Sequence, residues 1–148
     1  MKKVFIYYTL SGNGDVVADY LSGKSVDIRK IKIEKAMPKK YFLQILTGGF
    51  LASINAKAKL VDFNNDISKY DEIIIGSPIW NDRLTPAINT VLEKVDLTNK
   101  KVTFILYSGS GKSKHAKEKI KNIVANSTII DLKEPKKNNE ELKKIKNI

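Results

Sequence analysis

Between residues 9 and 15 the chain places small polar side chains and glycine directly after an apolar run. The stretch reads Thr9-Leu10-Ser11-Gly12-Asn13-Gly14-Asp15. Thr9 and Ser11 offer hydroxyl groups, and the two glycines let the backbone approach a ligand closely. The next segment has helical spacing, so its free N–H groups and the positive end of its dipole would point into the loop. This combination predicts a cradle for a phosphate group.

Two later loops have the same character. One extends from Ser77 to Arg83 and the other from Ser108 to Ser113, and each follows a continuous apolar run. The first contains Trp80, the only tryptophan of the chain. Stacking on a flat ligand ring would account for an aromatic side chain in such a polar loop, although it could instead cap the helix that follows. Ordinary turn chemistry explains only part of a composition that occurs three times.

Strands must precede these loops to position them. Continuously apolar runs are typical of strands that are covered on both faces, as in a parallel sheet. Three such runs predict central strands, at Lys2 to Tyr8, Glu72 to Gly76 and Lys101 to Tyr107. Two others resemble edge strands: Ser25 to Ile33, where alternation changes parity between Ile28 and Ile31 and suggests a bulge, and the short Ser127 to Leu132.

Helical patterns lie between the strands. The stretch Leu84 to Val95 has Thr85 as a possible N-cap and Pro86 in the first turn. Further helices are expected after the opening loop and after Ser113, and a short final helix is expected around Leu142, Ile145 and Ile148. Tyr41 to Ala56 is uncharged but too short to span a bilayer, and we expect a buried helix or a helix plus turn there.

The alternation of strands and helices predicts an α/β three-layer sandwich, and 148 residues fit one domain over residues 1–148. In such sheets ligands lie beyond the carboxyl ends of the strands, where the strand order reverses. All three polar loops leave the sheet at those ends. We therefore expect them to form one binding site.

The whole chain resembles the flavodoxin-like family, which binds flavin mononucleotide (FMN). The first loop, Thr9-Leu10-Ser11-Gly12-Asn13, matches the family pattern T-x-T/S-G-N-T at all but its last position. Gly76-Ser77-Pro78-Ile79-Trp80 is similar to the G-S-P-I-W found in many members. Ser108-Gly109-Ser110-Gly111 falls where another flavin-contacting loop lies in the family. The resemblance implies a five-stranded parallel sheet of order 2-1-3-4-5.

The resemblance also implies roles for individual residues. The phosphate would be held by Thr9, Ser11, Gly12 and Asn13, with backbone help from Leu10 and from Gly14. The isoalloxazine ring would be contacted on one side by Ser77, Pro78, Ile79, Trp80 and Asn81. Its pyrimidine edge would meet Ser108, Gly109, Ser110 and Gly111. No residue is assigned a catalytic or metal-binding role.

Two residues depart from the family pattern. Gly14 stands where a hydroxyl donor is usual, and Asp15 brings a negative charge toward a site for a dianion. The lost hydrogen bond would weaken FMN binding by about tenfold or more, since such a bond to a charged group contributes about 1.5 to 3 kcal/mol. The Gly14 N–H could compensate, and Asp15 could point away as a helix cap. A threonine at position 14 should tighten binding if the backbone has room for it.

The charge and composition of the chain limit the classes of partner that it could bind. The formal net charge is +11, from 27 basic and 16 acidic residues, whereas family members are commonly acidic. The lysines are interleaved with acids and lack regularly spaced aromatics, so a basic solvated surface is favoured over a nucleic-acid interface. An acidic-surfaced redox protein is the expected partner. With no cysteine and no signal-peptide core, a cytoplasmic location is expected, without a membrane segment.

The third polar loop contains part of a second nucleotide-binding pattern. Gly109 to Ser113 resembles the end of a nucleotide-binding G-x-x-x-x-G-K-S, but Leu106 occupies the position of the first glycine, which argues against that cradle. His115 is the only histidine and is expected at the surface, at the start of its helix.

Three functions stay open at this stage. The chain could be an FMN-dependent electron carrier between proteins, or an FMN-dependent NAD(P)H oxidoreductase acting on a quinone or flavin. The third is a flavin-free basic binding module, favoured only by the two departures and the surface charge. Whether the chain is an enzyme is left undecided.

Overall fold

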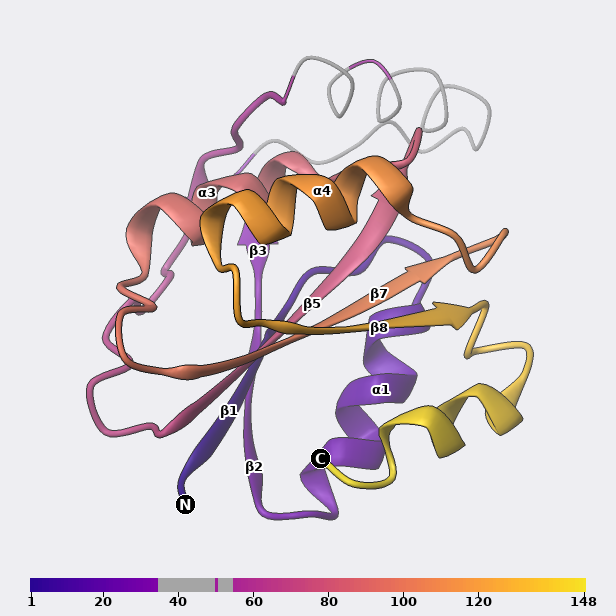
Figure 1. Cartoon of the computed structure of the whole chain (residues 1–148), viewed down its shortest axis with the longest axis horizontal. Helices are drawn as coiled ribbons and strands as arrows, with labels where there is room; N and C mark the ends of the chain where they lie inside the picture. The colour runs from indigo at the N-terminus through magenta and orange to yellow at the C-terminus, as the bar shows by residue number, and fades with distance from the viewer. Residues whose placement is uncertain (35–49, 51–54) are drawn as a thin grey trace.

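A parallel sheet forms the centre of the computed structural model, which describes residues 1–34, 50 and 55–148 (Figure 1). The strands lie in the order β2-β1-β5-β7-β8, which confirms the expected order 2-1-3-4-5. Their bounds are β1 Lys3–Tyr7, β2 Val26–Lys30, β5 Glu72–Trp80, β7 Lys101–Ser108 and β8 Thr128–Lys133. All neighbouring pairs in this order are parallel.

Helices cover both faces of the sheet. Helices α3 (Pro86–Lys94) and α4 (Lys114–Ile123) lie on one face, while α1 (Asn13–Ser22) and the 3₁₀ helix η1 (Asn139–Ile145) lie on the other (Figure 1). The expected three-layer sandwich is therefore confirmed. The C-terminus ends close to α1 (Figure 1).

The continuous apolar runs are explained by two cores, one on each face. In β1, Val4 and Ile6 pack toward α3 and α4, whereas Phe5 packs toward α1. In β5, Ile73 and Ile75 likewise alternate with Ile74, and all of these side chains are fully buried. Because successive strand residues face opposite sides, a sheet covered twice needs an apolar residue at every position.

The segment Ser25 to Ile33 is not one bulged edge strand, as the sequence suggested. After β2 the chain leaves the main sheet, and β3 (Lys32–Ile33) pairs antiparallel with β4 (Leu60–Val61) in a separate two-stranded sheet. Ile31 N still donates to Tyr7 O at 2.7 Å. Ile28 is 37% exposed and Ile31 is buried, so the change of parity marks the exchange of sheets.

The helix ends also differ from expectation in detail. Thr85 is the N-cap residue of α3, but its side chain makes no capping bond, and its buried Oγ1 has no hydrogen-bond partner among the described residues. The final helix is a 3₁₀ helix whose Ile145 is completely buried. The prediction for Tyr41 to Ala56 falls almost wholly outside the described residues.

The second polar loop is shorter than the sequence indicated. Strand β5 continues through Ser77 to Trp80 and then reverses into β6 (Arg83–Leu84), with Ile79 opposite Leu84. The two turn residues, Asn81 and Asp82, have φ angles of 49° and 58°. Positive φ at both positions is characteristic of a tight hairpin turn, and asparagine and aspartate tolerate it better than most residues.

Candidate functional site

The three polar segments meet at the carboxyl edge of the sheet. Strands β1, β5 and β7 are adjacent, and Tyr8 N donates to Gly76 O at 3.1 Å where β1 leaves the ladder. Pro78 lies opposite Tyr107 in the register of β5 and β7. The topology places the starts of the three segments side by side, and that they form one binding site stays a prediction.

Thr9 organises the first loop. Its Oγ1 accepts hydrogen bonds from Gly12 N and Gly14 N, both at 3.1 Å. A hydroxyl oxygen has two acceptor sites and one proton, so the Thr9 proton is left to donate to another group. Gly12 has a φ of 91°, a left-handed conformation in which a side chain would be strained. The loop is thereby held in a tight curve around the start of α1.

The start of α1 supplies further donors. The first intrahelical bond runs from Val16 N to Gly12 O at 3.3 Å, so the N–H groups before Val16 have no partner within the helix. Ser11 is exposed, and its Oγ accepts from Asn13 Nδ2 at 3.2 Å. Leu10 is also exposed, at 39%. Four predicted phosphate-binding residues, Thr9, Ser11, Gly12 and Asn13, thus surround one helix N-terminus.

Gly14 is buried in the first turn of α1, and its site has no room for a side chain. A Cβ atom there would lie 2.5 Å from the Tyr107 hydroxyl oxygen and 2.7 Å from Tyr7 Cδ2. The condition on which tighter binding by a threonine at position 14 depended, room for its side chain, is therefore not met. The cause is packing, because Gly14 lies in the helix and not in the positive-φ region.

Asp15 turns away from the first loop. Its Oδ1 accepts from the Tyr7 hydroxyl at 2.8 Å and pairs with Lys30 Nζ at 2.7 Å. Partial burial alone raises its pKa, but the hydrogen bonds from Lys30 and Tyr7, helped by the charges of Lys30 and Lys136, lower the pKa below its ordinary value. Asp15 is ionised and neutralised locally, and the N-cap position belongs to Gly12.

The second segment presents side chains of differing exposure. Ser77 is fully buried, and its hydroxyl donates to Pro78 O at 2.8 Å. Pro78, Ile79 and Trp80 are each partly buried. The Trp80 ring meets the Tyr8 ring edge to face, with 6.1 Å between centroids. Of this predicted set, Ser77 has its hydroxyl committed inside the protein, whereas Trp80 keeps part of its surface accessible.

The hairpin turn is attached to the start of α4. Asp82 O accepts from Ala116 N at 3.0 Å, and Asp82 Oδ2 lies 2.6 Å from His115 Nδ1. Asp82 therefore caps this helix, while the hydroxyl of the nominal N-cap, Ser113, donates to Asp131. His115 lies near the helix start and is exposed, as expected.

The third loop is a compact turn of small residues. Ser108 Oγ accepts from Gly111 N at 2.9 Å, and Ser110 Oγ accepts from Lys112 N at 3.2 Å. Gly111 has a φ of 68°. A Cβ atom on Gly109 would meet nothing within 4 Å, so the backbone there borders open space.

A cleft of about 380 Å³ lies between the hairpin turn and the third loop. This volume is within the range of about 300 to 1,000 Å³ that is typical of ligand sites. Its lining residues come from both segments: Ile79, Asn81, Asp82, Ser108, Gly109, Ser110, Lys112 and Lys114. The cleft thus brings together two of the three sequence-predicted segments and adds two lysines.

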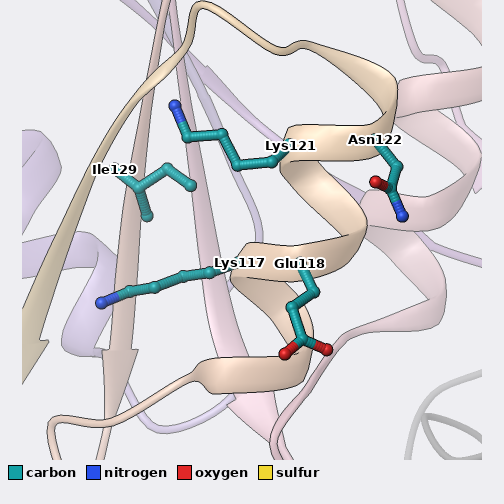
Figure 2. A pocket seen from close by; sticks show the side chains of 5 residues that line it. All are labelled: Lys117, Glu118, Lys121, Asn122 and Ile129. Atoms are coloured by element: carbon teal, nitrogen blue, oxygen red, sulfur yellow. The ribbon is translucent and has the colours of Figure 1, made fainter.

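A larger hollow, of about 770 Å³, lies between α4 and β8 and contains none of the predicted residues. Figure 2 shows Lys117 and Lys121 extending on either side of Ile129. Lys117 pairs with Asp131, and Lys121 donates to backbone carbonyls, including Ala125 O at 3.1 Å. Because its cations are used internally, this hollow is a poorer candidate for a ligand than the cleft.

Comparison with known families decides the assignment. The sequence model of a family described as flavodoxin matches residues 48–147, which is more than half of the chain. The chain belongs to the flavodoxin family. No curated protein matches it.

Solved structures share this flavodoxin fold. A protein from Bacteroides eggerthii named as a flavoprotein is 19% identical, with a TM-score of 0.71 and 96% of each chain covered. One from Bacteroides uniformis is 20% identical, with a TM-score of 0.70 over 86% of this chain and 85% of that one. A Lactobacillus acidophilus flavoprotein in complex with FMN is 17% identical, with a TM-score of 0.68 over 94% and 97% of the chains.

Several residues around the site were not among the predicted site residues of this flavodoxin. Asp82 and Lys114 line the cleft, Tyr107 packs beneath Gly14, and Lys136 reaches the first loop from the C-terminal part of the chain. Only Asp82 had a local signal, the Asn-Asp pair that suits a tight turn. Within the described ranges, no helix is both long and apolar enough to cross a bilayer.

Proposed function

We propose that this flavodoxin binds one FMN per chain and transfers electrons between proteins. The phosphate would lie in the first loop, and the isoalloxazine ring would lie in the cleft between the hairpin turn and the third loop. FMN, when bound, accepts and donates one or two electrons. The protein's own task is to hold the cofactor and set its surroundings.

The arrangement of Thr9 carries this proposal. Its oxygen holds Gly12 N and Gly14 N, so the loop is fixed before a ligand arrives and the hydroxyl proton is free to meet a phosphate oxygen. The N-terminus of α1 adds N–H groups and a favourable dipole. Asp15 does not oppose an anion strongly, because Lys30 neutralises it.

The cleft fits the ring portion of the cofactor. It is bordered by the apolar Ile79 and by the open backbone at Gly109, a combination that suits a flat heterocycle with a polar edge. Asp82 Oδ1 is buried without a hydrogen-bond partner among the described residues, so it would be an acceptor for a hydrogen bond from an N–H group on such an edge. The FMN complex of the Lactobacillus acidophilus flavoprotein, which shares the fold, supports the choice of cofactor.

The charge of the cleft rim supports an acidic protein partner. Lys112 and Lys114 are exposed and line the cleft, so the edge through which electrons would pass is basic. Together with the net charge of +11, this favours electrostatic steering of a partner with a negative face. An electron carrier needs such fast and transient contacts.

A titration with FMN tests the proposal. Micromolar FMN should be bound at one per chain, with quenched flavin fluorescence and a raised melting temperature. Adenosine monophosphate at the same concentration should leave the melting temperature unchanged. At a ligand concentration 100 times the dissociation constant, binding adds about 2.7 kcal/mol to the stability. Absence of both effects would show that the chain is a flavin-free module.

The electron-carrier role needs a second measurement on the loaded protein. Stopped-flow mixing with NADPH should give no rapid reduction of bound FMN, whereas a reduced electron-donor protein should reduce it. Rapid and saturable reduction by NADPH would instead support the oxidoreductase hypothesis. Both outcomes are read from the flavin absorption band.

A further inference from the structure

The segment between β8 and η1 folds over the first loop. Lys136 N donates to Asn13 Oδ1 at 3.1 Å, and Lys136 Nζ donates to Ser11 O at 3.1 Å. The same segment is tied to the third loop, because Glu134 N donates to Ser108 O at 3.0 Å. Lys136 and the first loop, more than 120 positions apart in the sequence, are thereby fixed against each other at the proposed phosphate site.

The ammonium group of Lys136 lies close to the curve of the loop. A Cβ atom built on Gly12 would be 3.1 Å from Lys136 Nζ and 3.4 Å from its Cδ. The side chain therefore extends across Gly12, beside the N-terminus of α1. Partial burial raises the pKa of Asp15, but Lys30 and Tyr7, and to a smaller extent the positive charge of Lys136, lower it below its ordinary value.

We infer that Lys136 is a phosphate-binding residue that makes the site selective for FMN over riboflavin. This inference rests on the proposed function. An ammonium group has three N–H donors, and one bond to Ser11 O leaves two for phosphate oxygens. Its charge adds to the helix dipole, which by itself amounts to about half an elementary charge.

The position of Lys136 explains how this flavodoxin can lack a hydroxyl at position 14. Packing of Gly14 against Tyr107 removes the space for a side-chain donor within the loop. A donor that arrives from the other end of the chain needs no such space, because it approaches over the exposed side of the loop. A charge-assisted hydrogen bond is also stronger than one from a neutral hydroxyl.

A purely mechanical role is the competing explanation. Lys136 could brace the loop through Ser11 O and Asn13 without touching a ligand. Bracing of the first loop would also weaken FMN more than riboflavin, because only FMN places a group in that loop. The two explanations differ in their dependence on salt: a direct charge contact with the phosphate is screened by salt, whereas a mechanical brace leaves the salt dependence of FMN binding unchanged.

Lys136→Gln tests the inference, with Lys143→Gln as the matched control. Lys143 lies on η1 and pairs with Glu140, and its replacement by glutamine removes the same single positive charge. Dissociation constants for FMN and riboflavin are measured by fluorescence at low and high sodium chloride. We expect Lys136→Gln to raise the dissociation constant for FMN about three- to tenfold and that for riboflavin less than about twofold. The control Lys143→Gln should leave both dissociation constants almost unchanged. Lys136→Arg should restore most of the FMN affinity.

The unaltered protein provides an independent check. Its affinity for FMN should fall with added salt, and Lys136→Gln should reduce that dependence. Equal losses for both ligands, an unchanged FMN affinity, or a loss of FMN affinity with unchanged salt dependence would overturn the inference while leaving flavin binding intact. Failure of the unaltered protein to bind either ligand would instead overturn the proposed function itself.

Discussion

Tyr107 and Gly14 are packed so closely that a methyl group on Gly14 would lie 2.5 Å from the Tyr107 hydroxyl oxygen. Tyr107 is almost completely buried and donates its hydroxyl proton to Tyr8 O. Burial, and then the nearby Tyr7 and Asp15, raise its pKa well above the ordinary value, so it remains a donor at any physiological pH. The end of β7 therefore fixes the first turn of α1, and with it the phosphate loop.

Gly14→Ala should destabilise the protein. The added methyl group must displace Tyr107 or Tyr7, and overpacking of this kind costs about 1 to 3 kcal/mol in the free energy of unfolding. Urea denaturation measures the loss. Gly23→Ala is the control, because a Cβ there would meet nothing closer than Tyr20 O at 3.7 Å. An unfolding midpoint as high as that of the unaltered protein would show that the tyrosines can move aside.

Thr9→Val should damage both the loop and cofactor binding. The valine has the same shape but cannot accept from Gly12 N and Gly14 N, which leaves two partly buried donors unpaired. Each unpaired donor costs about 1 to 3 kcal/mol when buried, and less here because of partial exposure. Thr9→Ser, which retains the hydroxyl, should bind FMN with an affinity within about threefold of the unaltered protein. Isothermal titration compares the three proteins, and equal affinities for valine and serine would remove Thr9 from the site.

The strands and loops were predictable because their signals are local. Runs such as Lys101 to Tyr107 must be apolar at every position when helices cover both faces, and this pattern needs no knowledge of the partners. The role of the Thr9 loop was equally predictable from the sequence, since hydroxyl groups and glycine before a helix imply hydrogen-bond donors for an anion. The exchange of sheets at Ile31 was visible as a change of parity, but its cause lies in the pairing with Leu60–Val61.

Other parts of the site depend on contacts between distant residues. Nothing near Lys136 indicates that it reaches Ser11, because the contact joins opposite ends of the chain. The crowding at Gly14 likewise comes from Tyr107, on another strand. The polar residues from Ser77 to Trp80 suggest a loop, yet Ser77 and Pro78 pair with β7 and Ile79 and Trp80 pair with β6, so tertiary context overrides their composition.

Asp15 predicts how stability should depend on pH. Its pKa is lowered in the folded protein from an ordinary value of 3.8, so it stabilises the fold above that value. This contribution is lost as the pH falls through the folded pKa. Asp15→Asn should therefore lower stability at pH 7 by up to about 1 kcal/mol, a modest amount because the Lys30 pair is half exposed. Denaturation from pH 7 down to pH 3 should show the two proteins converging, and a constant difference would exclude ionisation as the cause.

Lys112→Glu should make the reduction potential of bound FMN more negative. Reduction adds negative charge to the cofactor, and a cation on the cleft rim stabilises that charge. One unit charge about 8 Å away contributes on the order of 0.5 kcal/mol in water, and the substitution changes the charge by two units. Because the Debye length is about 8 Å at physiological salt, the shift should shrink as salt is added. Lys143→Glu is the control, because Lys143 lies on the opposite face of the sheet from α4. Spectroelectrochemistry measures the reduction potential of FMN bound to the unaltered protein and to each of the two variants. An equal shift in both variants would point to net charge alone, whereas no shift in Lys112→Glu would remove this lysine from the tuning of the cofactor.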